Sequence, residues 1–376
     1  MKFLIVCGGT GGHLSPGIAV DELLVARGHE SALVVSRKEV DSRLLQKYPH
    51  LNVRRLPGAA PGRSPVRLAR FLAGLVAGYR QTVRWIREDP PDLVLAFGGF
   101  LSLGVGLAAA RRKVPLVLHE ANRQPGRAIR FLRRFAERVY LPAGMSLPGL
   151  SPARIRHFGY PVRREFRRMD RRSARERLGL PVEGTLLVVI GGSQGAAPLN
   201  EWMDEHVRGL LREGIHVYGV RGPGKGAEGV LEERDEEGNL RSARMVSFCA
   251  EMNVLLSAAD LAVSRAGAGS IAELTQCRLP SVLVPYPHSG DEHQRANALF
   301  LESQGGCVVL PQTELGRLRE EILALLERPE LRDRMRTNLD RAVDANRKED
   351  LVADLEGIAA AGRSGDHRLQ TRRAAG

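Results

Sequence analysis

The chain has 376 residues, a formal net charge of +13 and 43% hydrophobic but only 5% aromatic residues. This length allows two or three domains with sizeable cores, and the basic excess favours an anionic partner: nucleic acid, a membrane surface or an anionic substrate. No basic stretch is interleaved with aromatic residues, which argues against nucleic acid. An arginine-rich composition is also what a compositionally biased genome would produce.

The cysteines and the apolar runs bear on the cellular location. Cys7, Cys249, Cys277 and Cys307 lie far apart and form no CxxC pair, which predicts reduced thiols in a cytosolic protein. The N-terminus begins with a strand pattern and glycines, unlike a signal peptide. No uncharged apolar run reaches the ~18 residues that a spanning helix needs.

Residues 2–29 predict a strand, a glycine turn and a helix. The apolar run 3–7 is too short for a helix and predicts a buried strand. Glycines fill most of residues 8–12, and Ser15 or Pro16 is expected to begin the helix. Such a turn lets backbone N–H groups approach a ligand, and the helix N-terminus favours phosphate. The same glycines would also serve a simple strand-to-helix turn.

Residues 31–36 predict a second strand, whose end is informative. In a dinucleotide-binding fold an acidic residue there would hold the ribose, but Ser36 and Arg37 occupy these positions. Leu14 also stands where the third glycine of the fingerprint belongs. Both facts count against an NAD-dependent oxidoreductase, although Arg37 would suit the 2′-phosphate of NADP.

Residues 66–87 predict a basic amphipathic helix. Apolar residues recur at helical spacing from Leu68 to Val76, and arginines such as Arg67, Arg70 and Arg80 lie among them. Such a helix can lie on an anionic membrane, or it can be half buried with a solvated basic face. The pattern alone favours the second interpretation, because most amphipathic helices are simply half buried.

Two further strand ends carry polar or glycine-rich sequence. Residues 92–106 predict a strand followed by a third glycine-rich loop, and residues 115–122 predict a strand that ends in polar residues. In an open parallel sheet, ligand sites form beyond the carboxyl ends of the strands. The predicted site at this edge comprises His13, Gly98, Gly99, His119, Glu120 and Asn122.

The second half of the chain repeats the logic of the first. Residues 154–172 are rich in arginine and predict the hinge, and Arg163 follows the Gly-Tyr-Pro-Val turn. Residues 186–190 predict a strand, followed by glycines and a helix over residues 200–212. Residues 222–239, which are acidic and glycine-rich, predict a loop.

A last glycine-rich turn lies within residues 265–274. Ser270 is expected to cap the next helix, with Glu273 in its first turn. A carboxylate there suits the helix dipole, and it also lies where it would accept two ribose hydroxyls. The basic tail from Gly362 is predicted to be disordered.

Together these patterns predict an α/β chain with two Rossmann-like domains facing each other across a cleft. The phosphate-favouring loops and Glu273 suit a nucleotide diphosphate. The sequence has no Asp-x-Asp pair for magnesium, no Walker A loop and no zinc-ligand spacing. We therefore expect no metal and no cofactor, with backbone amides, helix dipoles and Arg163 meeting the diphosphate charge.

A set of motifs carries a resemblance to a known family. In order along the chain they read GGTGGHLSPGIAV, FGGFLSLGVG, HEAN, GYPVR, GGSQGA, RAGAGSIAEL and HQRANA. In this order and spacing they resemble the bacterial peptidoglycan glycosyltransferases of the MurG family, which have the two-domain GT-B fold. The resemblance covers about residues 1–345. It implies an N-terminal domain over residues 1–160 on the acceptor and membrane side, a donor domain over 161–345 and a helix end with a tail over 346–376.

The resemblance implies an inverting transfer of N-acetylglucosamine (GlcNAc) from UDP-GlcNAc. The implied acceptor is undecaprenyl-diphosphate-N-acetylmuramoyl pentapeptide (lipid I), which becomes lipid II in peptidoglycan biosynthesis. It also implies a peripheral protein on the cytoplasmic side of the cell membrane, bound through a basic and apolar surface near residues 66–87. This implication reverses the preference given above for that helix.

Roles also follow from the resemblance, position by position. His13 matches a candidate general base, whose ordinary pKa fits that task. Cys249 matches a position whose backbone reads uracil, Glu273 the ribose contact and Gln294 the sugar contact. The implied UDP-GlcNAc residues are Thr10, Gly11, Gly12, Asn122, Arg163, Ser193, Cys249, Ala268, Gly269, Ser270, Ile271, Ala272, Glu273 and Gln294.

One departure and three alternatives accompany this interpretation. His293 stands where family members often have glutamine. Another GT-B nucleotide-sugar transferase with a different lipid acceptor, such as a diacylglycerol, would share the donor motifs. An NAD(P) oxidoreductase conflicts with the glycine spacing, and a non-catalytic sugar-nucleotide subunit would not need to keep His13 and Asn122.

Overall fold

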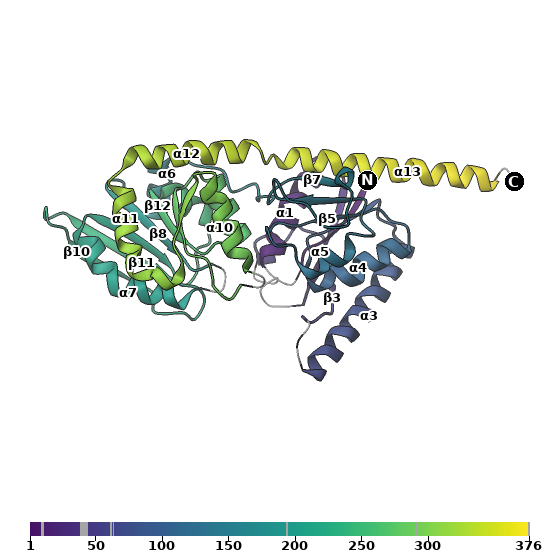
Figure 1. Ribbon diagram of the computed structural model, residues 1–376, viewed down its shortest axis with the longest axis horizontal. Helices are drawn as coiled ribbons and strands as arrows, with labels where there is room; N and C mark the ends of the chain where they lie inside the picture. The colour runs from purple at the N-terminus through teal and green to yellow at the C-terminus, as the bar shows by residue number, and fades with distance from the viewer. Residues whose placement is uncertain are drawn as a thin grey trace. The chain divides into compact units, whose positions relative to one another are not determined.

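The computed structural model describes residues 1–8, 11–37, 44–60, 62, 64–192, 195–289 and 292–374 (Figure 1). The chain divides into two compact units: unit 1 comprises Met1–Arg164 and Asn346–Gly376, and unit 2 comprises Glu165–Ala345. The chain therefore leaves unit 1 inside the predicted hinge segment, a few residues beyond the expected boundary at 160. The segment after 345 belongs to unit 1.

The strands in the described part of unit 1 form a parallel sheet in the order β3-β2-β1-β4-β5-β6-β7. Their bounds are β1 (Lys2–Val6), β2 (Glu30–Ser36), β3 (Val53–Leu56), β4 (Leu93–Ala96), β5 (Leu116–His119), β6 (Arg138–Leu141) and β7 (Ile155–His157). The central strands are short apolar runs with nearly every residue buried. This pattern is expected where helices cover both faces of a parallel sheet.

Alternate strand residues face two different cores in unit 1. Ile5 lies in the core with α1 and α13, whereas Leu4 and Val6 lie in the core with α4 and α5. α3 packs beside α4 (Figure 1). The helices are α1 (Gly11–Ala26), α3 (Pro65–Glu88), α4 (Gly99–Arg111), α5 (Arg127–Leu132) and α13 (Lys348–Ala374), with a 3₁₀ turn η1 (Pro152–Arg154).

The start of α1 differs from the prediction. We expected Ser15 or Pro16 to begin the helix, but α1 begins at Gly11 and contains Pro16. Proline lacks the N–H that would bond to the carbonyl four residues earlier, which here is the carbonyl of Gly12. The hydroxyl of Tyr160 donates a hydrogen bond to that carbonyl at 3.1 Å, so the carbonyl has a donor despite the proline.

Helix α13 runs to Ala374 and so includes the segment from Gly362, for which the sequence predicts disorder. Its first half packs on unit 1 through Leu351, Val352 and Leu355, which are fully or almost fully buried. Asp354 accepts hydrogen bonds from the Tyr140 hydroxyl at 2.6 Å and from Arg138. Apolar residues at helical spacing account for the docking of this helix.

The strands in the described part of unit 2 form a second sheet, in the order β10-β11-β9-β8-β12-β13-β14. The pairs are parallel except the β10–β11 hairpin. The strands are β8 (Thr185–Ile190), β9 (Ile215–Val220), β10 (Gly229–Arg234), β11 (Leu240–Val246), β12 (Leu261–Ser264), β13 (Ser281–Leu283) and β14 (Cys307–Val309). Strand β10 lies inside the segment predicted as a loop, because its exposed, acidic sequence hides the strand pattern.

The helices of unit 2 surround this sheet. Leu199 and Met203 of α7 and Ile322 of α11 share one core with the strands. The helices are α6 (Arg171–Leu178), α7 (Ala197–Arg212), α8 (Met252–Ala258), α9 (Ala268–Gln276), α10 (His293–Ser303), α11 (Leu318–Leu326) and α12 (Pro329–Asp344), with a 3₁₀ turn η3 (Gln312–Arg317). Buried Arg175 of α6 pairs with Asp260 at 2.7 Å and fixes this helix to the start of β12.

Candidate active site

Both sheets have a topological switch point where their glycine-rich loops begin. In unit 1, strand order reverses between β1 and β4, and in unit 2 it reverses between β8 and β12. Open α/β sheets bind ligands outside the carboxyl ends of the strands at such points. The loops that follow these four strands are the ones that the sequence singled out. Each unit therefore carries its own part of a candidate site.

His13 lies in the first turn of α1, next to the glycine loop after β4. A side chain at Gly99, whose φ is +75°, would place its Cβ 3.1 Å from the imidazole Nδ1 of His13. A Cβ at Gly98 would lie 3.8 Å from Nε2. The absence of side chains at Gly98 and Gly99 thus lets the imidazole lie against this loop. The imidazole is partly exposed, so it is accessible to a substrate.

His119, at the end of β5, is a buried residue with a structural hydrogen bond rather than an exposed site residue. Its side chain is fully buried, and Nε2 donates a hydrogen bond to the carbonyl of Gly159 at 2.7 Å. Burial lowers the pKa of His119 to about 4, against the opposing effect of that carbonyl and with a smaller lowering by His13. His119 is therefore neutral at pH 7.

Glu120 organises the loop that carries Asn122. One carboxylate oxygen of Glu120 accepts from the backbone N–H of Asn122 at 2.9 Å and from its side-chain Nδ2 at 3.1 Å. The other oxygen accepts from the N–H of Gly126 at 2.7 Å. Burial raises the pKa of Glu120, and these hydrogen bonds oppose that rise. These bonds fix the orientation of the Asn122 side chain.

Arg163 belongs to unit 1, one residue before the chain leaves that unit. Its guanidinium donates to the hydroxyl of Tyr48 at 2.8 Å. Of the other residues predicted for this loop region, Gly11 and Gly12 form the start of α1. Thr10 lies outside the described residues.

The glycine loop after β8 leads directly into α7. Gly195 has φ +69°, and a Cβ there would lie 2.2 Å from the carbonyl of Arg221, so only glycine fits. Asn200, in the first turn of α7, donates to the carbonyls of Arg221 and Lys225 at 3.1 and 2.9 Å. The start of this 16-residue helix is thus tied to the β9–β10 connection. Predicted Ser193 lies outside the described residues.

The segment after β12 begins α9 earlier than expected. Gly267 is the N-cap, with no side-chain cap, and the helix begins at Ala268. The predicted cap, Ser270, is therefore the third helical residue, and Glu273 falls in the second turn rather than the first. The flexible backbone at Gly267 makes a side-chain cap dispensable. Residues 268–273, all predicted to contact the nucleotide, lie together in the first two turns.

Arg265 connects this segment to the loop after β13. The buried Arg265 donates to the carbonyl of Val284 at 3.1 Å and to Gln312 Oε1 at 2.6 Å. Its guanidinium carbon lies 5.6 Å from the centre of the Tyr286 ring, and burial lowers its pKa. The N–H of Tyr286 in turn donates to Gln294 Oε1 at 2.9 Å. The Gln294 carboxamide oxygen is thus fixed, and its NH₂ group is the side that would meet a ligand.

The remaining predicted positions of unit 2 fall at the same sheet edge. Cys249 is buried and Phe248 is 61% exposed in the connection after β11. His293 is the first residue of α10, one position before Gln294. Arg265 was not predicted as a site residue, and Glu120 was predicted at this edge without its role in holding the Asn122 loop. The signal available for both was a charged residue directly after a buried apolar strand.

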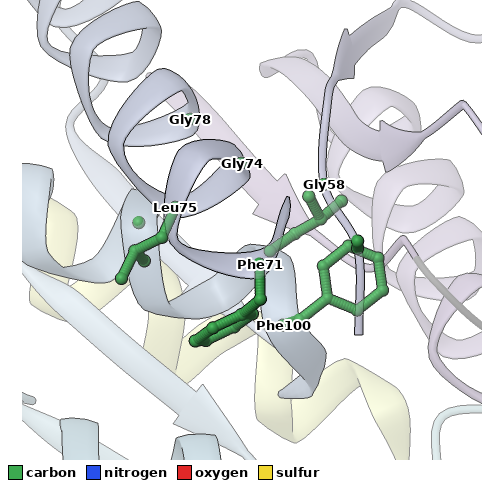
Figure 2. A pocket seen from close by; sticks show the side chains of 9 residues that line it. Gly58, Phe71, Gly74, Leu75, Gly78 and Phe100 are labelled. Carbon is green, nitrogen blue, oxygen red and sulfur yellow. The ribbon is translucent and has the colours of Figure 1, made fainter. Parts of the chain in front are cut away.

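An apolar hollow lies between α3, α4 and the loop after β3. It encloses about 230 Å³, including space open to solvent, and its lining has no charged side chain. Figure 2 shows the ring of Phe100 beside Gly58, and the Phe71 side chain also lines the hollow. A Cβ at Gly104 of α4 would lie 3.0 Å from the carbonyl of Leu75, so glycine allows α3 to pack closely on α4. With no polar side chain in its lining, the hollow is unsuited to a nucleotide.

No group of three or more His, Cys, Asp or Glu side chains in the described ranges has a metal-binding arrangement. In the same ranges, none of the helices combines the length and the apolar character needed to cross a bilayer.

The sequence matches both domains of one enzyme family. Residues 3–141 match the N-terminal domain of glycosyltransferase family 28, and residues 186–354 match its C-terminal domain. The UDP-N-acetylglucosamine–N-acetylmuramyl-(pentapeptide) pyrophosphoryl-undecaprenol N-acetylglucosamine transferase of Opitutus terrae is 50% identical over 354 residues, which cover 94% of each chain. The enzyme of the same name from Parasynechococcus marenigrum is 38% identical over 318 residues, covering 83% of this chain and 84% of that one.

Solved structures show the same fold. MurG of Acinetobacter baumannii superposes with a TM-score of 0.64 at 21% identity, over 92% of this chain and 99% of that one. The calicheamicin glycosyltransferase CalG4 gives a TM-score of 0.66 at 16% identity, over 96% and 98% of the two chains. The fold is GT-B, with two Rossmann-like domains, as predicted. Because both domains match and close relatives span most of its length, the chain belongs to glycosyltransferase family 28 and, within it, to the MurG transferases.

Proposed function

We infer that the chain transfers GlcNAc from UDP-GlcNAc to lipid I, giving lipid II and UDP in peptidoglycan synthesis. The observation that carries this conclusion is the 50% identity, over 94% of both chains, to the Opitutus terrae transferase of that name. The motifs that predicted this activity lie on the loops at the switch points of the two sheets. The activity is that of a hexosyltransferase.

We propose that unit 2 binds the donor nucleotide. The N-terminus of α7 and the glycine loop before it, which contains Ser193, suit the diphosphate, because backbone N–H groups and the helix dipole favour anions. Ala268–Glu273 receive the nucleoside, with the Glu273 carboxylate accepting from the ribose hydroxyls. The burial of the Cys249 side chain supports a backbone contact to uracil at that position. The NH₂ group of Gln294 donates to a hydroxyl of the sugar.

In unit 1, His13 is the proposed general base. The acceptor hydroxyl attacks the anomeric carbon of GlcNAc, its proton passes to the imidazole, and the bond to the UDP oxygen breaks with its electron pair. A single displacement of this kind inverts the anomeric carbon. Asn122 is proposed to contact the donor sugar, while Thr10, Gly11 and Gly12 lie near the sugar and the acceptor diphosphate. Arg163 offsets charge on the donor diphosphate.

We also propose that α3 contacts the cytoplasmic face of the membrane as a peripheral anchor. Among the residues of this 24-residue helix, Val66, Leu68, Leu72 and Val76 are all 46–60% exposed. Exposed arginines of the same helix include Arg67, Arg70 and Arg80. Exposed apolar side chains among arginines suit the boundary between acyl chains and anionic headgroups. This surface supports the location expected for an enzyme with a lipid-linked acceptor.

The donor assignment is tested by calorimetric titration with UDP-GlcNAc, with UDP-glucose and NADH as controls. We expect UDP-GlcNAc to bind in preference to both, and Glu273→Ala to weaken binding by about tenfold or more through loss of charge-assisted hydrogen bonds. Glu302→Ala, on α10, is the control for carboxylate removal elsewhere in unit 2 and should bind normally. Equal affinities of wild type and Glu273→Ala would refute the ribose contact.

A further inference from the structure

The segment where the chain leaves unit 1 is tied to the segment where it returns. Asn346 Oδ1 accepts from the N–H of Gly159 at 2.6 Å, and Asn346 Nδ2 donates to the carbonyl of Tyr160 at 3.2 Å. Lys348 donates to the carbonyl of Val162 at 3.2 Å. A Cβ at Gly159 would lie 2.8 Å from Asn346 Oδ1, so glycine permits this approach. These hydrogen bonds hold Tyr160 in place from the backbone side.

The side chain of Tyr160 extends from this junction to the first turn of α1. The ring is 6% exposed, and its hydroxyl donates to the carbonyl of Gly12 at 3.1 Å. Pro16 cannot supply the helical N–H that this carbonyl would ordinarily accept. The tyrosine hydroxyl thus substitutes for a helical hydrogen bond at the residue that directly precedes His13.

Gly159, in the same segment, also contacts the end of β5. The carbonyl of Gly159 accepts from buried His119, whose strand leads into the Glu120–Asn122 loop. The imidazole of His13 lies against Gly99 on the neighbouring loop. Residues 159 and 160 take part in four hydrogen bonds. These bonds join the segments where the chain leaves and re-enters unit 1 to the end of β5 and to the first turn of α1.

We propose that Tyr160 is a positioning residue for the His13 imidazole. Its hydroxyl fixes the peptide that joins Gly12 to His13, at a turn that a proline has deprived of an internal hydrogen bond. That peptide sets the direction in which the His13 side chain leaves the helix. This proposal rests on the proposed role of His13 as the base, and Tyr160 itself contacts no reacting atom.

Tyr160→Phe removes the hydroxyl and keeps the buried ring. We expect kcat to fall about fivefold, the rate equivalent of one ordinary hydrogen bond, with the KM for UDP-GlcNAc unchanged. The decisive comparison repeats the substitution in a His13→Ala background, where it should change the residual kcat by less than about twofold. Tyr140→Phe is the matched control, because it also removes a buried hydroxyl hydrogen bond, to Asp354 at 2.6 Å. It should leave kcat at the wild-type value.

A second measurement does not depend on activity. In protein labelled with ¹⁵N-histidine, the imidazole resonances of His13, assigned by their loss in His13→Ala, should shift or broaden in Tyr160→Phe. They should stay unchanged in Tyr140→Phe. Asn346→Asp keeps the acceptor for Gly159 but places a carboxylate oxygen against the carbonyl of Tyr160. It should displace the His13 resonances in the same direction as Tyr160→Phe.

Failure of this proposal is distinguishable from failure of the base assignment. An equal drop in kcat in both backgrounds would show that Tyr160 does not act through His13 and would overturn the proposal, as would unchanged His13 resonances in Tyr160→Phe. Full activity of His13→Ala would instead remove the base role. The resonances of His13 in Tyr160→Phe would then decide the positioning role alone.

Discussion

His13 is the residue on which the proposed chemistry depends most. Its imidazole lies against Gly99, it is partly exposed, and the first turn of α1 carries it at the switch point of the unit 1 sheet. A general base of this kind contributes roughly 10²- to 10⁴-fold to the rate. His119, which also lies at this edge, is buried and neutral, so it does not compete for the role.

His13→Ala should therefore lower kcat by about a hundredfold or more while the donor KM changes little, because none of the proposed donor contacts is made by His13. Steady-state kinetics with saturating lipid I analogue measures both constants. His50→Ala, an exposed histidine of the same unit, is the control and should behave as wild type. A His13→Ala enzyme with wild-type kcat would rule out His13 as the base.

His119 predicts a specific pH dependence of stability. In the folded chain its pKa is lowered to about 4 by burial, whereas in the unfolded chain it is about 6.5. As pH falls below about 6.5, the unfolded chain binds a proton that the folded chain excludes, so stability is lost progressively down to pH 4. The full loss is on the order of 3 kcal/mol.

This dependence is measured by urea unfolding of unit 1 between pH 7 and pH 4.5. The two tryptophans, Trp85 and Trp202, lie in different units, so a Trp202→Phe background reports on unit 1 through Trp85. His119→Gln in that background replaces the titrating group with an amide that can still donate to Gly159. Wild type should lose more stability with falling pH than His119→Gln. Parallel pH profiles would contradict the assignment.

Which residues lie at the site could be predicted to the extent that the ends of strands could be predicted. Short buried runs ending in glycine or polar residues placed His13, Asn122 and Glu273 at the active edges. What each side chain bonds to was not predictable, because the partners are remote in sequence. The bond between Tyr160 and Gly12 joins residues 148 positions apart, and no local pattern specifies it.

At the scale of elements, the amphipathic helix α3 is the proposed membrane contact. Its inner face, including Gly78 and Ile86, is buried, while its exposed face combines apolar residues with arginines. The sequence predicted this helix. It allowed two interpretations of the basic face, as a membrane contact or as a solvated surface. The structure adds that four large apolar side chains of α3 stay exposed.

Replacing Arg67, Arg70 and Arg80 with alanine should weaken binding to anionic vesicles by about a hundredfold, at roughly 1 kcal/mol per arginine near the surface. Sedimentation with vesicles that contain anionic phospholipid measures the partition, and high salt should reduce the difference. The matched control replaces Arg208, Arg212 and Arg317 with alanine. These are three exposed arginines of unit 2, and their replacement removes the same charge. Equal loss in both triple variants would place the membrane surface elsewhere.

The errors in predicted elements have physical causes. The helix α1 begins before Pro16 because a distant hydroxyl bonds to the carbonyl that the proline leaves without its helical donor. Strand β10 was missed because an edge strand with exposed glutamates lacks the alternation of a half-buried strand. Glu273 lies one turn deeper in α9 than expected because glycine, rather than Ser270, occupies the cap.

At the scale of the whole molecule, the sequence gives the two-domain organisation through its repeated strand, glycine-loop and helix pattern. It did not show that the chain returns to unit 1 after residue 345, where α13 docks beside α1. The docking residues Leu351, Val352 and Leu355 follow a helical pattern that is equally compatible with packing on either unit. Tertiary contacts therefore decide the assignment of this segment.

The central claim is that the chain moves GlcNAc from UDP-GlcNAc onto lipid I. The most direct test incubates the purified chain with UDP-GlcNAc labelled in the sugar and with a short-chain lipid I analogue. The account predicts label in the lipid product and one UDP released per sugar transferred, with UDP-glucose a poor donor. If UDP-GlcNAc binds but its sugar reaches only a different lipid, such as a diacylglycerol, or no lipid at all, the account is contradicted.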